Sequence, residues 1–338
     1  MKNKFLLLLI LGVTFFASCN DDDDDKVRTY NGDSLSLSVG GINFSDREAV
    51  LNGPVLTLKQ ALPGENETEF TIIREGNKIT GVNSNANREV ALNGTIDGDK
   101  LGLNLTLKVK SSMKAKWDVK KLFLNVEPEY IVEEGEPDLV GLVGMLGSMV
   151  SYIMPNISFE EDGNIVAYYC KDMANMGNPE AYENSPKGMA LYNVVDNKIY
   201  IALNLSGIVE DATTPKAESS IGRSDYNPLT SLMAMVDTGL PLYLRDGEEG
   251  LKEVYVDREM MLPVVKMLPS LLSAYGDKLG DYKETLEQIV AALVPLVENS
   301  EVVELGLQLA PYTEIPTPAT NVQSLSKMIE NASLKFVK

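Results

Sequence analysis

The residues that this chain offers for catalysis are carboxylates, lysines and tyrosines, because the sequence contains no histidine. That absence excludes a Ser–His–Asp triad, a Cys–His dyad and any zinc site that needs histidine ligands. The two cysteines, Cys19 and Cys170, are too few for a thiolate metal site. No P-loop or dinucleotide-binding glycine motif occurs. Any catalysis would therefore use paired carboxylates, as in glycoside hydrolysis, or a lysine or tyrosine base.

Acidic residues occur close together at several expected turns. The groups are Glu160/Glu161, Glu248/Glu249, Asp97/Asp99 and Asp162/Asn164. Adjacent residues on a strand point to opposite faces, so the glutamate pairs are not arranged as an acid and base couple. The other two groups lack the spacing of a complete calcium loop and are interpreted as turn residues. We therefore expect no catalytic residue, no metal site and no cofactor, and the alternative is a carboxylate-dependent glycan hydrolase.

Methionines and tyrosines are the residue types that could line a binding site. The methionines gather after residue 144, where they either form a plastic apolar pocket or simply fill a core. They are Met145, Met149, Met154, Met173, Met176, Met189, Met233, Met235, Met260, Met261 and Met267. Tyrosines allow carbohydrate binding, but Trp117 is the only tryptophan. Cys170 lies in a strand-like run and is interpreted as a buried, inert thiol.

The segment of about 80 residues from residue 30 to residue 112 has the pattern of strands. Residues Ser34 to Val39 alternate polar and apolar side chains, as a half-buried strand does. Further strand patterns occur at 55–58, 70–73, 78–82, 89–96 and 101–109. The dipeptide Asp97-Gly98 between the last two predicts a hairpin. These elements predict an antiparallel β sandwich or half-barrel over residues 30–112.

The remaining segment, residues 113–338, combines strands with helices. Turn residues predict three hairpins, centred on Asp162-Gly163-Asn164, Asp196-Asn197 and 246–250. With an opening strand at Trp117 and a late strand at 301–310, eight strands suit an up-and-down barrel, or a two-sheet sandwich. Helices are predicted at 139–154, which has the alternative of a flexible apolar segment, and at 227–239, 257–275 and 281–297. A last strand is predicted at 334–337.

The first residues have the pattern of a secretion signal. Lys2 and Lys4 precede an apolar run that ends at Phe16 and is too short to span a bilayer. Residues 1–18 are therefore expected to be removed. The tetrapeptide that ends at Cys19 resembles the lipobox of bacterial lipoproteins. That resemblance implies lipid chains on Cys19, whereas the alternative is an ordinary signal peptide with a chance cysteine.

Five aspartates follow the predicted anchor. A run of like charges repels itself and stays solvated, which suits a spacer over residues 19–29. The run also resembles the export signal that places Bacteroidetes lipoproteins on the outer face of the outer membrane; its members would be Asp21, Asp22, Asp23, Asp24 and Asp25. The alternative is anchoring that faces the periplasm. Asp33-Ser34-Leu35 matches the O-glycosylation pattern of that bacterial group, which makes Ser34 a candidate acceptor.

Two short patterns resemble calycin-like β domains, which are common in Bacteroidetes lipoproteins. They are Tyr30 to Leu35 and Leu92 to Leu101. Trp117, early in its strand, is similar to the tryptophan that closes lipocalin-like barrels, although Ala115 stands where that family has glycine; the alternative is a plain core tryptophan. The resemblance implies a mainly β fold with inserted helices, in which a lipocalin-like antiparallel barrel follows the N-terminal domain.

The charge balance limits the partners. The formal net charge is −19, and removal of the two signal lysines makes it about −21. Such a chain repels nucleic acid and anionic lipid, so nucleic acid is not an expected partner. We expect a non-catalytic surface lipoprotein with a binding or scaffold role, which holds a small apolar molecule or a glycan at the mouth of the C-terminal β domain. The alternatives are the glycan hydrolase and an accessory subunit of an outer-membrane complex.

Overall fold

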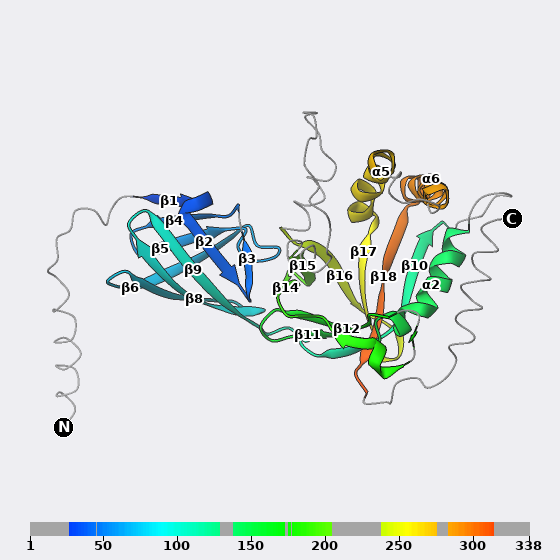
Figure 1. Cartoon of the computed structure of the whole chain (residues 1–338), viewed down its shortest axis with the longest axis horizontal. Coiled ribbons are helices and arrows are strands. Elements are labelled where there is room, and N and C mark those ends of the chain that lie inside the picture. Colours follow the sequence, from blue (N-terminus) through cyan, green and yellow to red (C-terminus); the bar gives the residue numbers. More distant parts are fainter. Residues whose placement is uncertain are drawn as a thin grey trace, which may run out of the picture.

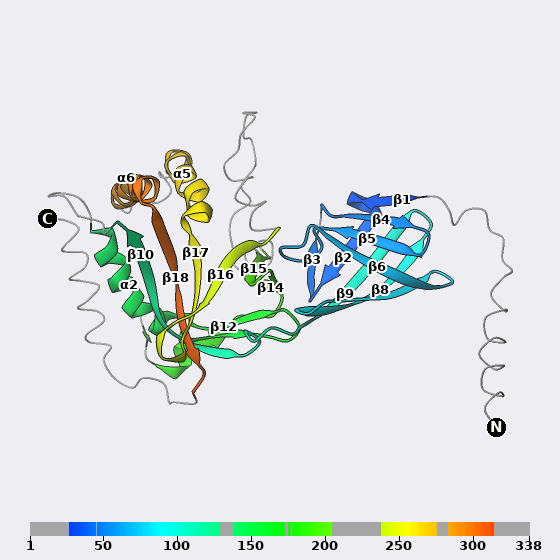
Figure 2. The same cartoon turned by 180° about the vertical axis from the view of Figure 1, so that it is seen from behind.

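The computed structural model describes residues 27–44, 46–128, 138–172, 175–176, 178–204, 238–275 and 283–313. Two curled nine-stranded sheets follow one another along the chain, and the α-helices lie at the far side of the second sheet (Figures 1 and 2). The prediction of a mainly β chain with inserted helices is confirmed. The predicted signal, anchor and acidic run lie outside the described residues. So do the predicted strand at 334–337 and almost all of the predicted helix at 227–239.

The first sheet is built from the strands before residue 110. They are β1 (Arg28–Asn31), β2 (Leu35–Val39), β3 (Ile42–Phe44), β4 (Glu48–Asn52), β5 (Val55–Lys59), β6 (Glu67–Glu75), β7 (Lys78–Ser84), β8 (Arg88–Asp97) and β9 (Lys100–Val109). Their order is β1-β4-β5-β6-β7-β8-β9-β2-β3. Alternate residues are buried in β9, as the sequence pattern predicts. The predicted β8–β9 hairpin is confirmed, with Gly98 at a φ of +57° in its turn.

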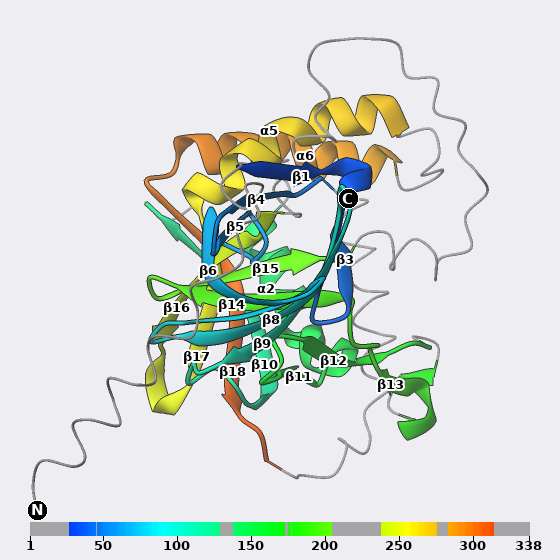
Figure 3. The ribbon, with the colours of Figure 1, turned by 90° about the vertical axis from the view of Figure 1, so that its left-hand side faces the viewer.

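One pairing corrects the expectation of a wholly antiparallel N-terminal sheet. β2 lies parallel to β9, from Leu35 beside Leu101 to Val39 beside Leu105. The cause is the short helix η1 (Gly32–Ser34), which separates β1 from β2 and lets them join opposite ends of the sheet. The curl that brings those ends round is visible along the molecule in Figure 3.

The second sheet contains the remaining strands. They are β10 (Lys116–Glu127), β11 (Asn156–Phe159), β12 (Ile165–Cys170), β13 (Tyr182–Asn184), β14 (Ala190–Val195), β15 (Lys198–Leu203), β16 (Leu240–Asp246), β17 (Lys252–Asp257) and β18 (Val302–Pro311). Their order is β13-β12-β11-β10-β18-β17-β16-β15-β14. The three predicted hairpins are confirmed as β11–β12, β14–β15 and β16–β17.

The described part of the second region contains nine strands, one more than the eight predicted. The additional strand is β13, which pairs with β12 so that Cys170 lies opposite Tyr182. Apart from the pairings between neighbouring strands, one isolated β-bridge in the described residues connects Asn164, just before β12, to Leu191 of β14. The sheet is therefore a curled half-barrel in the part of the chain that is described.

In the residues that the structure describes, three α-helices pack on one face of the second sheet. They are α2 (Leu139–Ile153), α5 (Arg258–Tyr275) and α6 (Lys283–Asn299), and the helix prediction for 139–154 is confirmed. The Asp138 side chain caps α2 by accepting from the Gly141 amide at 2.7 Å. As predicted, Asp257 caps α5, accepting from the Met260 amide. The helices share a buried cluster with the strands: Leu139, Met261, Val265, Leu296, Val297 and Val303. Two further short helices are η3 (Pro179–Ala181) and η4 (Glu248–Gly250).

One apolar core runs through both sheets. It contains residues of β9 together with Trp117, Tyr192 and Val254 of the second sheet. Trp117 is buried, and its indole N–H donates to the Met113 carbonyl at 2.9 Å. A side chain at Gly163 would collide with Leu107, so the backbone of the β11–β12 turn lies directly on the first sheet. Because the cores are continuous, the two sheets support each other.

Candidate functional site

The acidic groups found in the sequence do not assemble into a reactive site. Glu161 is exposed and forms an ion pair with Lys114 at 3.4 Å. Glu160 lies 3.6 Å from Lys187, which also bonds to Asp162. Within the described residues, no three carboxylate or thiol groups are placed to hold a metal ion. The interpretation of these acids as turn and surface charge agrees with these contacts.

Two other carboxylates do come together, on the second sheet. Arg245 on β16 bonds through Nε to Glu253 at 2.6 Å and through both terminal nitrogens to Glu304 at 2.8 Å. Gln308 donates to the other oxygen of Glu253, and Asn125 donates to Glu304. Four neighbouring strands, β10, β18, β17 and β16, thus contribute to one hydrogen-bonded network.

Aromatic rings lie beside this network. Tyr243 and Tyr255 stack with their centroids 5.5 Å apart, and Phe123 lies 6.4 Å from Tyr255. The Arg245 guanidinium carbon is 4.5 Å from the centre of the Tyr255 ring, and Lys198 Nζ is 4.3 Å from that of Tyr243. We call this surface the polar–aromatic face; its residues are Phe123, Asn125, Lys198, Tyr243, Arg245, Glu253, Tyr255, Glu304 and Gln308.

The strand pairing explains why these residues gather. The β16–β17 hairpin places Arg245 beside Glu253 and Tyr243 beside Tyr255, and successive side chains on a strand alternate between faces. The residues between them point the other way, so Leu244 and Val254 pack in the core. The helices α2, α5 and α6 pack on that core side. The polar–aromatic face is consequently the side of β10 and β16–β18 that points away from those helices.

Hydrogen bonds and charge shift the pKa values of Glu253 and Arg245. Desolvation acts to raise the pKa of Glu253, but hydrogen bonds from Arg245 and Gln308, together with the arginine charge, outweigh it and lower the pKa. The hydrogen bond to Glu304 is the main reason that the pKa of Arg245 is raised. A glycosidase needs one carboxyl group that stays protonated to donate to the leaving group. Glu253 shares one guanidinium with Glu304 instead, and its lowered pKa does not suit that acid role.

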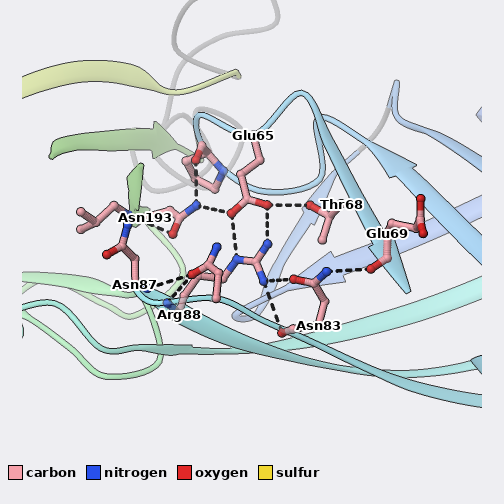
Figure 4. A network of polar contacts seen from close by, with 10 residues as sticks. Glu65, Thr68, Glu69, Asn83, Asn87, Arg88 and Asn193 are labelled. Carbon is pink, nitrogen blue, oxygen red and sulfur yellow. Dashed lines mark hydrogen bonds and ion pairs between the residues drawn. The ribbon is translucent and has the colours of Figure 1, made fainter. Parts of the chain in front are cut away.

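A second polar network lies at the junction of the two sheets (Figure 4). Arg88 of β8 contacts Glu65 at 2.5 Å, and Thr68 and Asn193 donate to the same carboxylate at 2.9 and 3.0 Å. Asn193 belongs to β14 of the second sheet and also donates to the Pro63 carbonyl. Desolvation opposes ionisation of Glu65, yet the bonds from Arg88, Asn193 and Thr68 lower its pKa. This buried network connects the first sheet to β14 of the second sheet.

A groove of about 550 Å³ runs between α5 and α6. Its lining is mainly apolar: Pro269, Leu272, Ser273, Glu287, Val290, Ala291, Val294 and Pro295. None of the residues that line this groove is a methionine. Met149, Met176, Met261 and Met267 are buried, which favours the interpretation of these residues as core filling.

The two remaining candidates that the structure describes lie in different elements, Ser34 in η1 and Cys170 in β12 of the second sheet. Cys19 and the five aspartates are outside the described residues. Ser34 ends η1, and its hydroxyl donates to the Asn31 carbonyl at 2.7 Å and accepts from the Asn31 amide. Cys170 is buried, with its thiol 3.2 Å from the Asp172 carbonyl. None of the described candidates is part of the polar–aromatic face.

Sequence reasoning missed that face, although a usable signal was present. The predicted hairpin at 246–250 fixes which residues of its two strands share a face. A turn centred on Glu248 would place Arg245 opposite Leu251, whereas the structure pairs Arg245 with Glu253. The difference of two residues keeps these side chains on one face, so the hairpin predicts the face and not the exact pairs. Glu304 could not be found in the same way, because β18 reaches β17 from a distant part of the chain.

No protein-family model, curated protein or solved structure matches this chain. None of the helices in the described residues is long and apolar enough to cross a membrane.

Proposed function

We propose that this chain is a non-catalytic lipoprotein, anchored in the outer membrane through Cys19 and displayed at the cell surface, which binds a glycan-type ligand on the polar–aromatic face. The observation that supports binding is the exposed arginine in that face. The Arg245 side chain is 40% exposed, although it is held by two carboxylates and lies over Tyr255 and Phe123. Its bonds to Glu253 and Glu304 use three of its five N–H groups, so the others are free to bind hydroxyl oxygens.

The anchoring rests on the lipobox-like tetrapeptide and the aspartates that follow it. Intact-mass measurement of detergent-extracted protein should show acyl chains that are absent after Cys19→Ser. Protease treatment of whole cells should remove the wild-type protein, and replacement of the five aspartates by asparagine should make it resistant. An unmodified Cys19, or wild-type protein that the protease does not reach, contradicts this part of the proposal.

Ligand binding can be tested by native mass spectrometry of protein purified from its own cells. We expect a bound carbohydrate mass on the wild-type protein and less bound carbohydrate on Tyr243→Ala. Tyr312→Ala is a matched control, because Tyr312 also has a lysine over its ring, with Lys116 Nζ at 4.0 Å. A carbohydrate retained equally by both variants, or glycan cleavage by the wild-type protein, contradicts the proposal.

The groove between α5 and α6 supports a second candidate, an apolar ligand. A fluorescent fatty acid should bind to the wild-type protein and lose affinity when Ala291→Trp fills the groove. Lys266→Trp is the control, since Lys266 lies on α5 outside the residues that line the groove. Equal binding by both variants excludes this groove.

We also propose that the two sheets are related to calycin-like domains. The support is the curl of both sheets and the position of Trp117 near the start of β10. An experimental structure in which the Asn164–Leu191 bridge extends into a ladder between β12 and β14 would support a barrel. Two separate flat sheets would argue against it.

A further inference from the structure

The outer side of the first sheet carries a continuous row of uncharged side chains. Six neighbouring strands, β6-β7-β8-β9-β2-β3, each place one residue in this row. The strand registers put each residue directly beside the next: Ile73, Thr80, Asn93, Asn104, Ser38 and Asn43. At about 4.8 Å per strand the row is about 24 Å long.

The flanking rows are nearly uncharged as well. On one side lie Val82, Ala91 and Thr106, and on the other Lys78, Thr95, Gly102 and Ser36. Lys78 and Glu75, which lie opposite each other on β7 and β6, are the only charged residues in these three rows, all of whose members are described by the structure. In a chain with 30 basic and 49 acidic residues, an outward sheet surface of this size would ordinarily carry several charges. We call the three rows the neutral face.

The hydrogen-bonding groups of the neutral face are available to a ligand. Asn93, Asn104 and Thr80 are exposed, and within the described part of the chain their side chains make no hydrogen bond. Amide and hydroxyl groups both donate and accept, so this surface suits a partner whose groups do both. Ile73 and Val82, 66% and 61% exposed, add apolar contact at the β6–β7 side.

Gly102 makes the centre of the face shallow. A hollow of about 450 Å³ lies there, and its polar lining includes Lys78, Thr80, Asn93, Thr95 and Asn104. At Gly102 an added Cβ would meet only the Thr95 hydroxyl, at 3.4 Å. The hollow at that position is therefore open space above the strand and is not needed for packing.

We propose that the neutral face is a binding site for an uncharged polysaccharide, separate from the polar–aromatic face. Sugar hydroxyls donate and accept as the Asn and Thr side chains do, and the C–H surfaces of sugar rings suit Ile73 and Val82. An anionic polymer is disfavoured by the net charge of −19, and a cationic protein would find only one negative charge in these rows, that of Glu75 opposite Lys78. A second copy of the chain is disfavoured because only two large apolar side chains are exposed there.

The test is isothermal titration of the detergent-purified full chain with a panel of neutral polysaccharides (glucan, mannan and xylan) and charged ones (polygalacturonate and chondroitin sulfate). We expect at least one neutral polymer to bind and the charged ones not to. Gly102→Val should weaken that binding at least tenfold while leaving the melting temperature within a few degrees, because valine favours strands. Asn93→Ala with Asn104→Ala should weaken it similarly, whereas Asn52→Ala on β4 should not.

Three results would overturn the proposal: no binding to any neutral polymer, preferential binding to a charged one, or neutral-polymer binding that Gly102→Val leaves intact. A concentration-dependent dimer that Gly102→Val dissociates would also overturn it, because the occupant would then be a second copy. Tyr243→Ala separates this site from the proposed function. It should weaken ligand binding to the polar–aromatic face and leave polysaccharide binding to the neutral face unchanged.

Discussion

The Arg88 guanidinium and the Glu65 carboxylate lie 2.5 Å apart, with only 4% and 11% of their side chains exposed. Asn193 of the second sheet donates to the same carboxylate, so a hydrogen bond connects this ion pair to the second sheet. Lys59 and Glu48 form an ion pair of similar length, 2.6 Å, on the surface of the first sheet. The two pairs offer a direct comparison of buried and exposed charge in one molecule.

Removal of the buried carboxylate should be strongly destabilising. Glu65→Ala leaves the Arg88 charge buried without its partner, which costs about 3–5 kcal/mol of unfolding free energy. Glu48→Ala should change the free energy far less, because water screens its exposed partner Lys59. Urea unfolding of both variants measures the difference. Equal losses would mean that water reaches Glu65 freely.

The same carboxylate should make stability depend on pH. The pKa of Glu65 is lowered in the folded chain, so its contribution is fully present above the ordinary value of 4.5. It is then lost as the pH falls below 4.5 and through the lower folded-state pKa. The difference in stability between wild type and Glu65→Gln should therefore shrink on acidification. A difference that stays constant from pH 6 to pH 3 would contradict the lowered pKa.

Replacement of Gly64 by alanine should lower the stability of the protein more than replacement of Gly76. Both have a positive φ, of +76° and +64°, so alanine strains either backbone by about 1 kcal/mol. At Gly64 a Cβ would also overlap the Tyr200 ring, whereas at Gly76 it meets nothing within 4 Å. Overpacking should add about 1–3 kcal/mol to Gly64→Ala alone. Thermal unfolding of the two variants checks this, and equal shifts would contradict the close approach.

The start of α2 depends on a single side chain. Asp138→Ala removes the bond to the Gly141 amide and should cost about 0.5–2 kcal/mol. Asp138→Asn keeps an oxygen acceptor and should cost much less. Hydrogen exchange in the first turn of α2 would show the effect directly. Identical exchange in both variants would mean that another group caps the helix.

Local patterns predicted the hairpins, because a turn and its two strands are close in sequence. The β8–β9 hairpin with Asp97-Gly98, and the β14–β15 hairpin with Asp196-Asn197, depend on a few residues with a positive φ. The short strand β13 was missed because three residues carry too little pattern and need β12 to form. The parallel β2–β9 pair was missed because its partners are more than sixty residues apart.

The candidate site was less predictable than the fold. Half of the polar–aromatic face follows from the β16–β17 register, but Glu304 and Phe123 join it through strands distant in sequence. The Glu65–Arg88 pair carries no sequence signal, because its burial depends on contact with Asn193 across the junction. Of the acidic groups in the sequence, Glu160, Glu161 and Asp162 form ion pairs with lysines, whereas Asn164 is buried.

The place of β18 has a consequence for how the chain can fold while it is being made. The last described strand lies between β10 and β17, the central position of the second sheet. Until residues 302–311 emerge, β10 and β17 are each left with an unpaired edge, and such edges invite aggregation. A chain synthesised from its N-terminus would therefore complete this sheet only after residues 302–311 have been made. A premature stop before Val302 would leave two half-sheets without the strand that joins them.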